Sequence, residues 1–325
     1  MLKILQETKQ EYLPNYKKLL RHQKYGTIGQ NTAVKICHWT KSSIKGEGTC
    51  YKNKFYGIES HQCIQMTPNV SYCNHKCNFC WRPLTGKNSE IPVDDPEFIV
   101  EESIEHQIKL LSGLGGISDQ IDLKKFKESS HPKHVAISLA GEPTLYPRIS
   151  ELIEAYHKRG CSTFLVSNGT RPETLASMTL PTQLYISLES PTKELYDKIN
   201  RSDEPDSFYK LMKTLEILPM LNCRKAVRIT CLKGMNMEDI HAEQFAEKLK
   251  IAQPDFVEVK AYMHVGFSRK RMREFNMPSH KEVIEFAQKI NEHLNYHWGS
   301  DHEPSRVAML YSGKKEAKIN FEELH

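Results

Sequence analysis

The sequence predicts a parallel α/β fold in the form of a partial (β/α) barrel. Short apolar segments alternate with helix-forming segments between residues 134 and 264. Strands that alternate with helices form parallel β/α units, and such units gather ligands at the carboxyl ends of their strands. The chain has 325 residues, which is enough to bury the core of one barrel or of two domains.

The predicted elements follow one another in a regular order. Buried strands are expected in five segments that each end in small or polar residues: 134–147, 161–170, 183–190, 225–234 and 255–264. Helices are expected next to them, at 149–160, 191–199, 207–218 and 237–250. Apolar residues at helical spacing predict another helix over residues 97–114. Residues 115–133 are polar and weakly periodic, so we interpret them as a surface insertion.

The composition favours a cytoplasmic protein that is not embedded in a membrane. Hydrophobic residues make up 39% of the chain, and no apolar run approaches the roughly 18–20 residues that span a bilayer. Residues 1–26 read as a basic amphipathic helix rather than as a signal peptide, so the nine cysteines are expected to be reduced. The net charge of +5 permits a nucleic-acid partner without establishing one.

The run NVSYCNHKCNFCWRP carries the most informative feature, the trio Cys73, Cys77 and Cys80. Three thiolates so close in sequence can bind one face of an iron–sulfur cubane, which leaves one iron without a protein ligand. An open site on a metal is typical of a catalytic centre. The alternative is a zinc site completed by His75 or His61, although zinc sites favour paired C-x2-C units.

This pattern, C-x3-C-x2-C with Phe79 before the last cysteine, resembles the signature of the radical S-adenosylmethionine (SAM) superfamily. The resemblance implies a [4Fe-4S] cluster whose open iron chelates the amino and carboxylate groups of SAM. It also implies that the reduced cluster cleaves SAM to a 5′-deoxyadenosyl radical.

A second set of cysteines lies upstream. Cys37, Cys50 and Cys63 are separated by two equal gaps of twelve residues. Equal long gaps suit a cluster held between separate segments, again with one open iron. The alternative is that they are unrelated reduced cysteines of the core. Core cysteines are also expected in the apolar strands: Cys161, Cys223 and Cys231.

The stretch from Cys50 to Pro83, with Cys37 before it, resembles the N-terminal region of the tRNA 4-demethylwyosine synthases of the single-domain archaeal type. These radical SAM enzymes build the tricyclic base next to the anticodon of phenylalanine tRNA. The resemblance runs from about Val34 to the C-terminal strand. It implies a cluster-binding extension at 1–68, a partial (β/α)6 TIM-type barrel at 69–262 and a wyosine-specific region at 263–325.

The family carries a lysine just after the middle cysteine of the second set, which Lys52 matches, with Lys54 as its rival. Most lysines are solvated surface charges. A lysine beside a cluster and next to Tyr51 and Phe55 would instead be desolvated, which lowers its pKa and yields a neutral amine for a Schiff base. The second substrate of the family is pyruvate, whose keto group suits such an amine.

Candidate contacts to SAM lie at the strand ends. Gly141 and Glu142 stand where radical SAM proteins have a Gly-Gly-Glu motif, with Ala140 in place of the first glycine. Asn168 can hydrogen-bond a ribose hydroxyl. The remaining candidates are polar or charged residues at later strand ends: Ser187, Glu189, Arg228 and Lys233. An ordinary turn, a solvated acid or a structural cation is the competing interpretation of each.

A basic run with aromatic neighbours lies in the C-terminal segment 261–280. It consists of Arg269, Lys270, Arg271 and Arg273 beside Phe267 and Phe275. Such a mixture suits phosphate and stacking contacts to an extruded RNA base, although a short basic run is more often a solvated face. The N-terminal helix adds basic residues to the same expected surface: Lys17, Lys18, Arg21 and Lys24.

The resemblance implies a reaction between N1-methylguanosine-37 of tRNA-Phe and pyruvate. The radical removes hydrogen from the N-methyl group, the carbon radical adds to pyruvate, and loss of the carboxyl carbon with ring closure gives 4-demethylwyosine. Two [4Fe-4S] clusters, SAM and a separate electron donor of the flavodoxin or ferredoxin type are expected. The alternatives are another radical SAM enzyme, such as an activase or methylthiotransferase, and a non-catalytic metal-binding protein that binds RNA.

Overall fold

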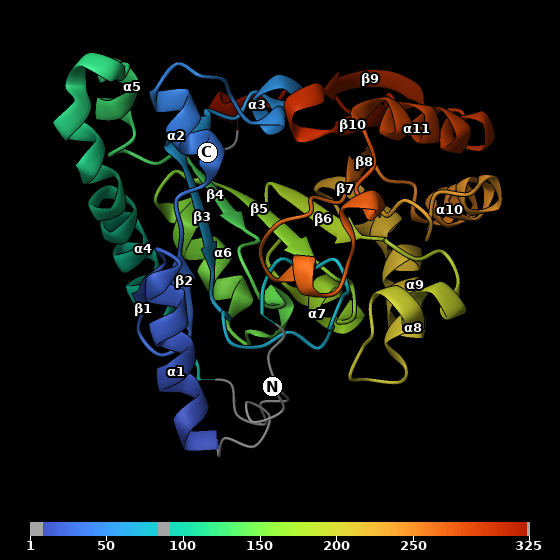
Figure 1. Ribbon diagram of the computed structural model, residues 1–325, viewed down its shortest axis with the longest axis horizontal. Helices are drawn as coiled ribbons and strands as arrows, with labels where there is room; N and C mark the ends of the chain where they lie inside the picture. Colours follow the sequence, from blue (N-terminus) through green and yellow to red (C-terminus); the bar gives the residue numbers. More distant parts are fainter. Residues whose placement is uncertain (1–8, 84–91, 324–325) are drawn as a thin grey trace.

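A computed structural model describes residues 9–83 and 92–323 of the chain (Figure 1). One ten-stranded sheet forms its centre, with the strand order β1-β2-β3-β4-β5-β6-β7-β8-β10-β9. The strands from β3 to β8 run parallel to one another. Their bounds are β3 Cys63–Thr67, β4 His134–Ile137, β5 Ser162–Ser167, β6 Gln183–Ser187, β7 Arg224–Cys231 and β8 Phe256–Ala261. These six parallel strands confirm the predicted partial barrel.

Helices follow the parallel strands and cover the outer face of the sheet (Figure 1). They are α4 Pro96–Leu111, α6 Ile149–Lys158, α7 Pro172–Ser177, α8 Lys193–Ile199, α9 Ser207–Ile217 and α10 Asp239–Ala252. Apolar side chains at helical spacing on α6, such as Leu152 and Ile153, share one core with strand residues such as Val135 and Leu165. The predicted alternation of strands and helices is therefore confirmed.

Short antiparallel strands extend both edges of this barrel. β1 Gly26–Ile28 pairs with β2 Thr32–Val34, which pairs with β3. At the other edge, β10 Val307–Tyr311 pairs with β8 and with β9 His297–His302. The strands β1, β2 and β3 were not predicted from the sequence. Each has only three to five residues, which is too short for a pattern of alternation to stand out.

Residues 115–133 are more than the predicted surface insertion, because they contain the helix α5 Leu123–Glu128. Asp122 accepts a hydrogen bond from the Lys125 backbone as the N-cap of α5. Its own backbone N–H donates to the Ile44 carbonyl at the end of α2 His38–Ile44. The segment therefore braces the region that carries Cys37 and Cys50.

The helix α3 Tyr51–Tyr56 closes the amino-terminal end of the barrel. Its aromatic side chains pack with Phe164 on β5, Tyr185 on β6 and Phe256 on β8 in one apolar cluster. The Tyr56 and Phe256 ring centroids lie 5.3 Å apart. Because Phe164 and Phe256 stand in the first halves of their strands and Tyr185 at the middle of β6, the carboxyl ends remain open for the site.

All three predicted segments contribute to the same sheet. The segment 1–68 supplies β1 to β3, 69–262 supplies β4 to β8, and 263–325 supplies β9 and β10. The division at residues 68 and 262 therefore remains a prediction. The predicted N-terminal helix is present as α1 Lys9–His22, and residues 1–8 lie outside the described part of the chain. Within that part, no helix is long and apolar enough to cross a membrane.

His134, at the start of β4, predicts how the stability of the fold depends on pH. Burial lowers its pKa to about 3, below the value of roughly 6.5 expected for the unfolded chain. The neutral ring therefore stabilises the folded state above pH 6.5, and this contribution is lost as the pH falls towards 3. Between pH 7.5 and 5.5 the loss is about 1.4 kcal/mol.

The substitution His134→Asn removes the titrating group and keeps a side-chain partner for the Ser162 hydroxyl, which lies 2.7 Å from the ring. Urea denaturation between pH 7.5 and 5.5 should show a smaller loss of unfolding free energy for this variant than for the wild type. Equal losses would show that His134 is protonated in the folded protein.

Candidate functional site

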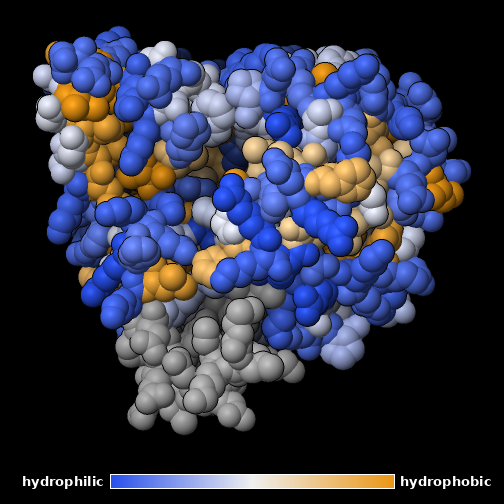
Figure 2. Space-filling view, in the orientation of Figure 1, coloured by the Kyte–Doolittle hydropathy of each residue, from blue (hydrophilic) through white to orange (hydrophobic). Residues whose placement is uncertain are grey.

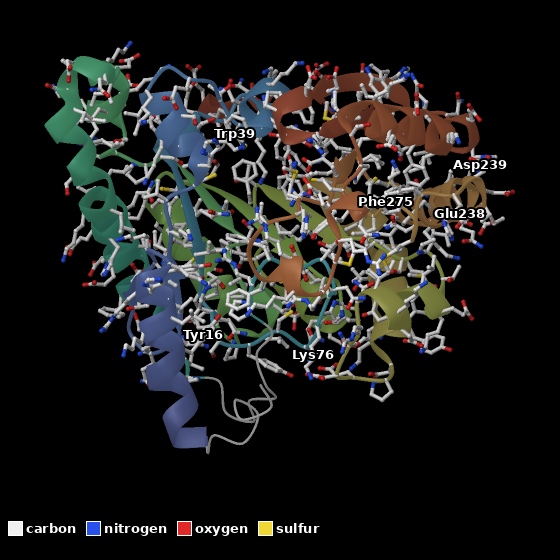
Figure 3. The ribbon with its side chains drawn as sticks, viewed as in Figure 1. Tyr16, Trp39, Lys76, Glu238, Asp239 and Phe275 are labelled. Atoms are coloured by element: carbon white, nitrogen blue, oxygen red, sulfur yellow. The ribbon has the colours of Figure 1, made fainter. Side chains whose placement is uncertain are left out.

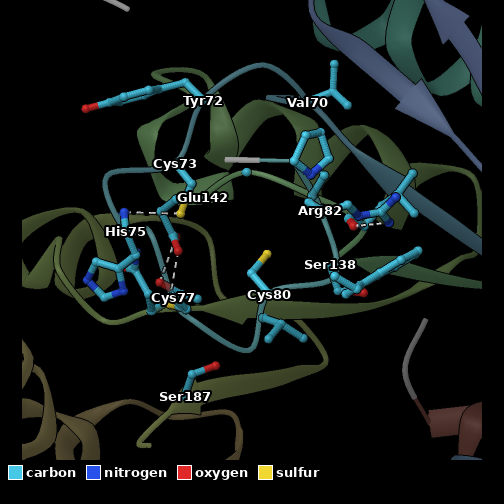
Figure 4. Close-up of a pocket in the computed structure, with 18 of the residues that line it drawn as sticks. Val70, Tyr72, Cys73, His75, Cys77, Cys80, Arg82, Ser138, Glu142 and Ser187 are labelled. Carbon is cyan, nitrogen blue, oxygen red and sulfur yellow. Dashed lines mark hydrogen bonds between the residues drawn. The ribbon is translucent and has the colours of Figure 1, made fainter. Parts of the chain in front are cut away.

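Cys73, Cys77 and Cys80 line one hollow at the carboxyl ends of the barrel strands, with a volume of about 250 Å³. Figure 4 shows the sulfur atoms of Cys73 and Cys80 pointing into it, with Ser187 on the wall below. The hollow brings together most of the candidates for SAM contacts: Phe79, Gly141, Glu142, Asn168, Ser187 and Glu189. The roles of these residues remain predictions.

Gly141 fixes the cluster loop, residues 70–83, against the end of β4. Its φ is +67°, and a Cβ at this position would lie 1.8 Å from the Asn69 carbonyl oxygen and 2.6 Å from that of Tyr72. Only glycine fits such an approach. Ala140 departs from the expected motif without consequence for the backbone, since its carbonyl accepts a hydrogen bond from the Thr67 hydroxyl at 2.6 Å.

The Glu142 carboxylate is buried and hydrogen-bonded within the protein. It accepts from the Thr144 hydroxyl at 2.7 Å, the Ser167 hydroxyl at 2.8 Å and the Asn168 backbone N–H at 2.8 Å. The Asn168 amide in turn donates to the Asn74 side chain in the cluster loop at 2.8 Å. Glu142 and Asn168 therefore join two strand ends to the loop, which the sequence did not reveal.

The other side of the cluster loop rests on the end of α8. The Asn78 backbone N–H donates to the Ile199 carbonyl at 3.0 Å, and the Lys76 N–H donates to the Asn200 carbonyl at 3.0 Å. The Asn200 side chain also donates to Glu189 at 3.3 Å. Burial raises the pKa of Glu189 to about 7.

Arg271, predicted as part of an RNA-binding run, turns inward instead. Its guanidinium donates to the backbone carbonyls of Asn78, Cys80 and Arg82. The Phe267 backbone N–H donates to the Trp81 carbonyl at 3.0 Å. In Figure 1 the segment around residue 270 lies across the cluster loop. The C-terminal segment therefore holds the exit of that loop.

The thiols of the cluster loop are suited to a cluster. Burial raises the pKa of Cys73, Cys77 and Cys80, and for the first two a nearby carboxylate adds to the effect. Such thiols stay protonated until a metal stabilises the thiolate. A reduced [4Fe-4S] cluster with one open iron fits this set of donors.

The zinc alternative lacks ligands. Among residues 9–83 and 92–323, no three His, Cys, Asp or Glu side chains converge on a site for a single ion. The His75 Nε2 atom lies 2.6 Å from the Tyr196 hydroxyl. The His61 Nε2 atom lies 2.8 Å from the Glu128 carboxylate. Both rings are thus held by other partners.

The upstream cysteines meet near the amino-terminal end of the barrel. Cys37 is the N-cap of α2, Cys50 is the N-cap of α3, and Cys63 begins β3. The charge of the Cys37 thiolate raises the pKa of both Cys50 and Cys63. The three thiols are therefore neighbours. Burial raises the pKa to about 11 for Cys50 and about 12 for Cys63. This second trio is also compatible with a cluster, and that role remains a prediction.

The structure separates the two candidate lysines. The Lys52 amine lies 4.4 Å from the ring centroid of Tyr185 and 5.2 Å from that of Phe164, inside the barrel. Burial and then repulsion by Arg228 lower its pKa. Lys54 is exposed, and its amine donates to the Asp301 carbonyl at 2.5 Å. Lys52 alone of the two has the predicted environment.

Arg228 and Lys233 are not among the residues that line the SAM hollow, and their contact with SAM remains a prediction. Arg228 donates from Nε to the buried Glu258 carboxylate at 3.0 Å and from the guanidinium to the Tyr51 hydroxyl at 2.7 Å, nearer to Lys52. Lys233 pairs with Glu282 at 2.5 Å on the outside of the barrel. Glu258 was missed, although a charge inside the apolar segment 255–264 was a signal of a polar interior.

The fold and the open three-thiol loop define a radical SAM protein. Residues 70–246 match the profile of the Radical SAM superfamily, and residues 251–312 match the profile described as wyosine base formation. Membership of the superfamily gives the chain SAM and an iron–sulfur cluster as cofactors.

The chain belongs to the family of S-adenosyl-L-methionine-dependent tRNA 4-demethylwyosine synthases. The relative from Pyrococcus abyssi is 49% identical over 90% of this chain and 87% of its own length. The relative from Methanocaldococcus jannaschii is 40% identical over 93% and 97%. A mouse relative is 36% identical over 95% of this chain, which spans 43% of that protein.

Two solved structures agree with this placement. A structure of TYW1 with a lysine–pyruvate adduct bound is 38% identical, with a TM-score of 0.85 over 97% of this chain and 99% of that one. A structure of archaeal TYW1 is 35% identical, with a TM-score of 0.78 over 96% and 100%. The chain is thus an enzyme of tRNA wyosine biosynthesis, which sets aside the activase, methylthiotransferase and non-catalytic alternatives.

Arg271 provides a test of the cluster-loop geometry. The substitution Arg271→Gln removes charged donors from three carbonyls, and hydrogen bonds to charged groups contribute about 1.5–3 kcal/mol. We expect weaker SAM binding and an altered electron paramagnetic resonance spectrum of the reduced, SAM-bound enzyme. Lys213→Gln, on the remote helix α9, is the control. If only tRNA binding weakens, Arg271 belongs to the RNA surface instead.

Proposed function

We propose that this chain condenses N1-methylguanosine-37 of tRNA-Phe with pyruvate to form 4-demethylwyosine. In this proposal it acts as a carbon–carbon lyase with two [4Fe-4S] clusters. The cluster loop would hold the cluster that binds SAM, and Cys37, Cys50 and Cys63 would hold the second. When bound, SAM and the reduced cluster supply a 5′-deoxyadenosyl radical, the oxidant that can remove hydrogen from an N-methyl group.

The observation that carries the proposal is the position of Lys52 in the same barrel interior as the SAM hollow. Tyr185, beneath the Lys52 amine, and Ser187, on the wall of the hollow, are two residues apart on β6. Side chains two residues apart on a strand point the same way, about 7 Å from each other. Phe164 and Val166 repeat this arrangement on β5. A substrate held by Lys52 would therefore lie next to the SAM hollow.

The chemistry of Lys52 suits a keto acid. Its lowered pKa favours the neutral amine, which can attack the keto carbonyl of pyruvate and expel water to form an imine. The 38% identical structure of TYW1 with a lysine–pyruvate adduct supports the same use of a lysine. Arg228 and Lys260 provide positive charge for the pyruvate carboxylate. Burial lowers the pKa of Lys260 to about 8.

The partners follow from this reaction. The RNA substrate would approach the face in Figure 2 on which hydrophilic and apolar side chains are mixed over the cluster loop. Electrons would come from a separate flavodoxin- or ferredoxin-type donor in the cytoplasm. The barrel walls would exclude water and other hydrogen donors, because a carbon radical that meets such a donor is quenched.

The test is the product of the wild-type enzyme. Protein reconstituted without oxygen should contain about eight irons per chain. With SAM, dithionite, pyruvate and tRNA-Phe carrying 1-methylguanosine, it should yield 4-demethylwyosine by mass spectrometry of the digested tRNA. Cys50→Ala should lower the iron content to about half and abolish the product. Full iron and full product in that variant would remove the second cluster from the proposal.

Lys52 and Lys54 form a matched pair for a second test. Lys52→Ala should abolish the product and the borohydride-trapped pyruvate adduct, since Lys52 is the lysine, among the residues described, whose amine lies over the Tyr185 ring. Cleavage of SAM to 5′-deoxyadenosine should persist. Lys54→Ala should retain product, because its amine contacts only the surface carbonyl of Asp301 among the described residues. The reverse result would assign the amine to Lys54.

A further inference from the structure

A second hollow lies directly beside the SAM hollow, with a volume of about 480 Å³. This is within the range of about 300–1,000 Å³ typical of small-ligand sites. The N-terminal segment contributes Gln23 and Lys35, the cluster loop contributes Trp81, and the C-terminal segment contributes Phe267 and Lys270. We call it the Trp81 hollow. Neither the catalytic cysteines nor Lys52 line it.

The charge of the Trp81 hollow is positive and uncompensated. The Lys35 amine donates to the Gln23 carbonyl at 2.8 Å, and the Lys270 amine lies 5.2 Å from the Phe267 ring centroid. In the described ranges neither amine forms an ion pair with an acidic side chain. Residues 259–273 contain five lysines and arginines and no acid. An anion would therefore be attracted to this hollow.

Arg82 packs behind Trp81 and lines the SAM hollow rather than the Trp81 hollow. It is 5% exposed, and its guanidinium carbon lies 3.3 Å from the Trp81 ring centroid. Its Nε and Nη1 atoms find no acceptor among the residues described. A buried cation with unmet donors is costly unless a negative group binds nearby. Trp81 thus stands between this cation and the open hollow.

The aromatic rings of the hollow remain available for stacking. Trp81 is 39% exposed although it belongs to the cluster loop, and Phe267 is partly exposed on the opposite wall. Exposed aromatic rings beside unpaired cations match the two parts of a nucleotide. The base stacks on the rings, and the phosphate pairs with the amines. An acidic protein surface would use the cations but not the rings.

We propose that the Trp81 hollow binds an RNA nucleotide that neighbours the modified one. This inference rests on the proposed function. Trp81 lines both this hollow and the SAM hollow, so its side chain forms a wall that the two hollows share. The nucleotide with the reacting methyl group must enter the SAM hollow. The adjacent nucleotide then lies on the other side of Trp81, and its stacking splays the two bases apart.

The Lys35→Gln/Lys270→Gln double variant tests the phosphate contact. Binding of an anticodon stem-loop RNA with 1-methylguanosine is measured on the holoenzyme over a range of salt concentrations. The slope of log affinity against log salt should fall by about one to two. Lys250→Gln removes an exposed lysine on α10, away from both hollows, and should keep the wild-type slope. A wild-type slope in the double variant overturns the proposal.

Phe267→Leu tests the stacking contact and leaves the backbone bond from Phe267 to Trp81 in place. RNA affinity should fall roughly tenfold, the usual loss for one stacked base, while the iron content stays at the wild-type value. In parallel, 4-thiouridine is placed at each nucleotide next to the 1-methylguanosine, and photo-crosslinks are mapped. A crosslink to Trp81 or Phe267 supports the proposal. Crosslinks that map exclusively to other residues refute it.

Product formation by the wild type separates this inference from the proposed function. If the wild type makes 4-demethylwyosine and both variants bind RNA as it does, only the Trp81 hollow is misassigned. If the variants bind RNA normally but accept electrons from flavodoxin more slowly, the hollow serves the reductant, and the proposal is wrong. If the wild type makes no product, the proposed function itself fails.

Discussion

The site depends on one constraint, which is that an irregular loop with three thiols must be held rigid from outside. The cluster loop has no helix or strand of its own in the described structure beyond a single bridge from His75 to Ser202. Its backbone is therefore fixed by neighbours, and each neighbour comes from a different part of the chain. The end of β4 holds the start of the loop through Gly141, the end of α8 holds its middle, and Arg271 holds its exit. A cluster that must present one open iron at a fixed place requires such support.

This arrangement links the wyosine-specific segment to the general radical machinery. The segment that matches the wyosine profile begins at residue 251 and contains both Phe267 and Arg271. The same segment also exposes Phe275, at 63%, to solvent on the near face in Figure 3. One face of the segment therefore contacts the cluster loop while the other exposes an aromatic ring to solvent. If RNA binds this outer face, as proposed, the same short segment would connect that contact to the loop that holds the three thiols.

Much of this was predictable from the sequence, and the exceptions have physical causes. The cysteine trios and the parallel β/α order follow from spacing and local pattern, which a sequence displays directly. The sequence did not show which way Arg228 and Lys233 point, because a side chain at a strand end can point inward, outward or along the barrel, and its partner decides the direction. Glu258 draws Arg228 towards Lys52, and Glu282 draws Lys233 outside. Both partners lie 30 or more residues away in sequence, so no local pattern records the pairing.

The charges of the barrel interior explain why anionic ligands belong there. The buried Glu258 carboxylate accepts hydrogen bonds from Arg228 and from the Tyr51 and Tyr56 hydroxyls. The Glu258 charge raises the pKa of Lys52 and of Lys260, yet burial and repulsion by Arg228 outweigh it and lower both pKa values. The one carboxylate balances the guanidinium, and a protonated amine on Lys52 or Lys260 adds positive charge that Glu258 does not cancel. An incoming keto acid brings the missing negative charge, and a second cluster bound by thiolates would bring more. A protonated Lys260 in this interior favours an anionic ligand such as the proposed keto acid, which ties the fold of the barrel to its chemistry.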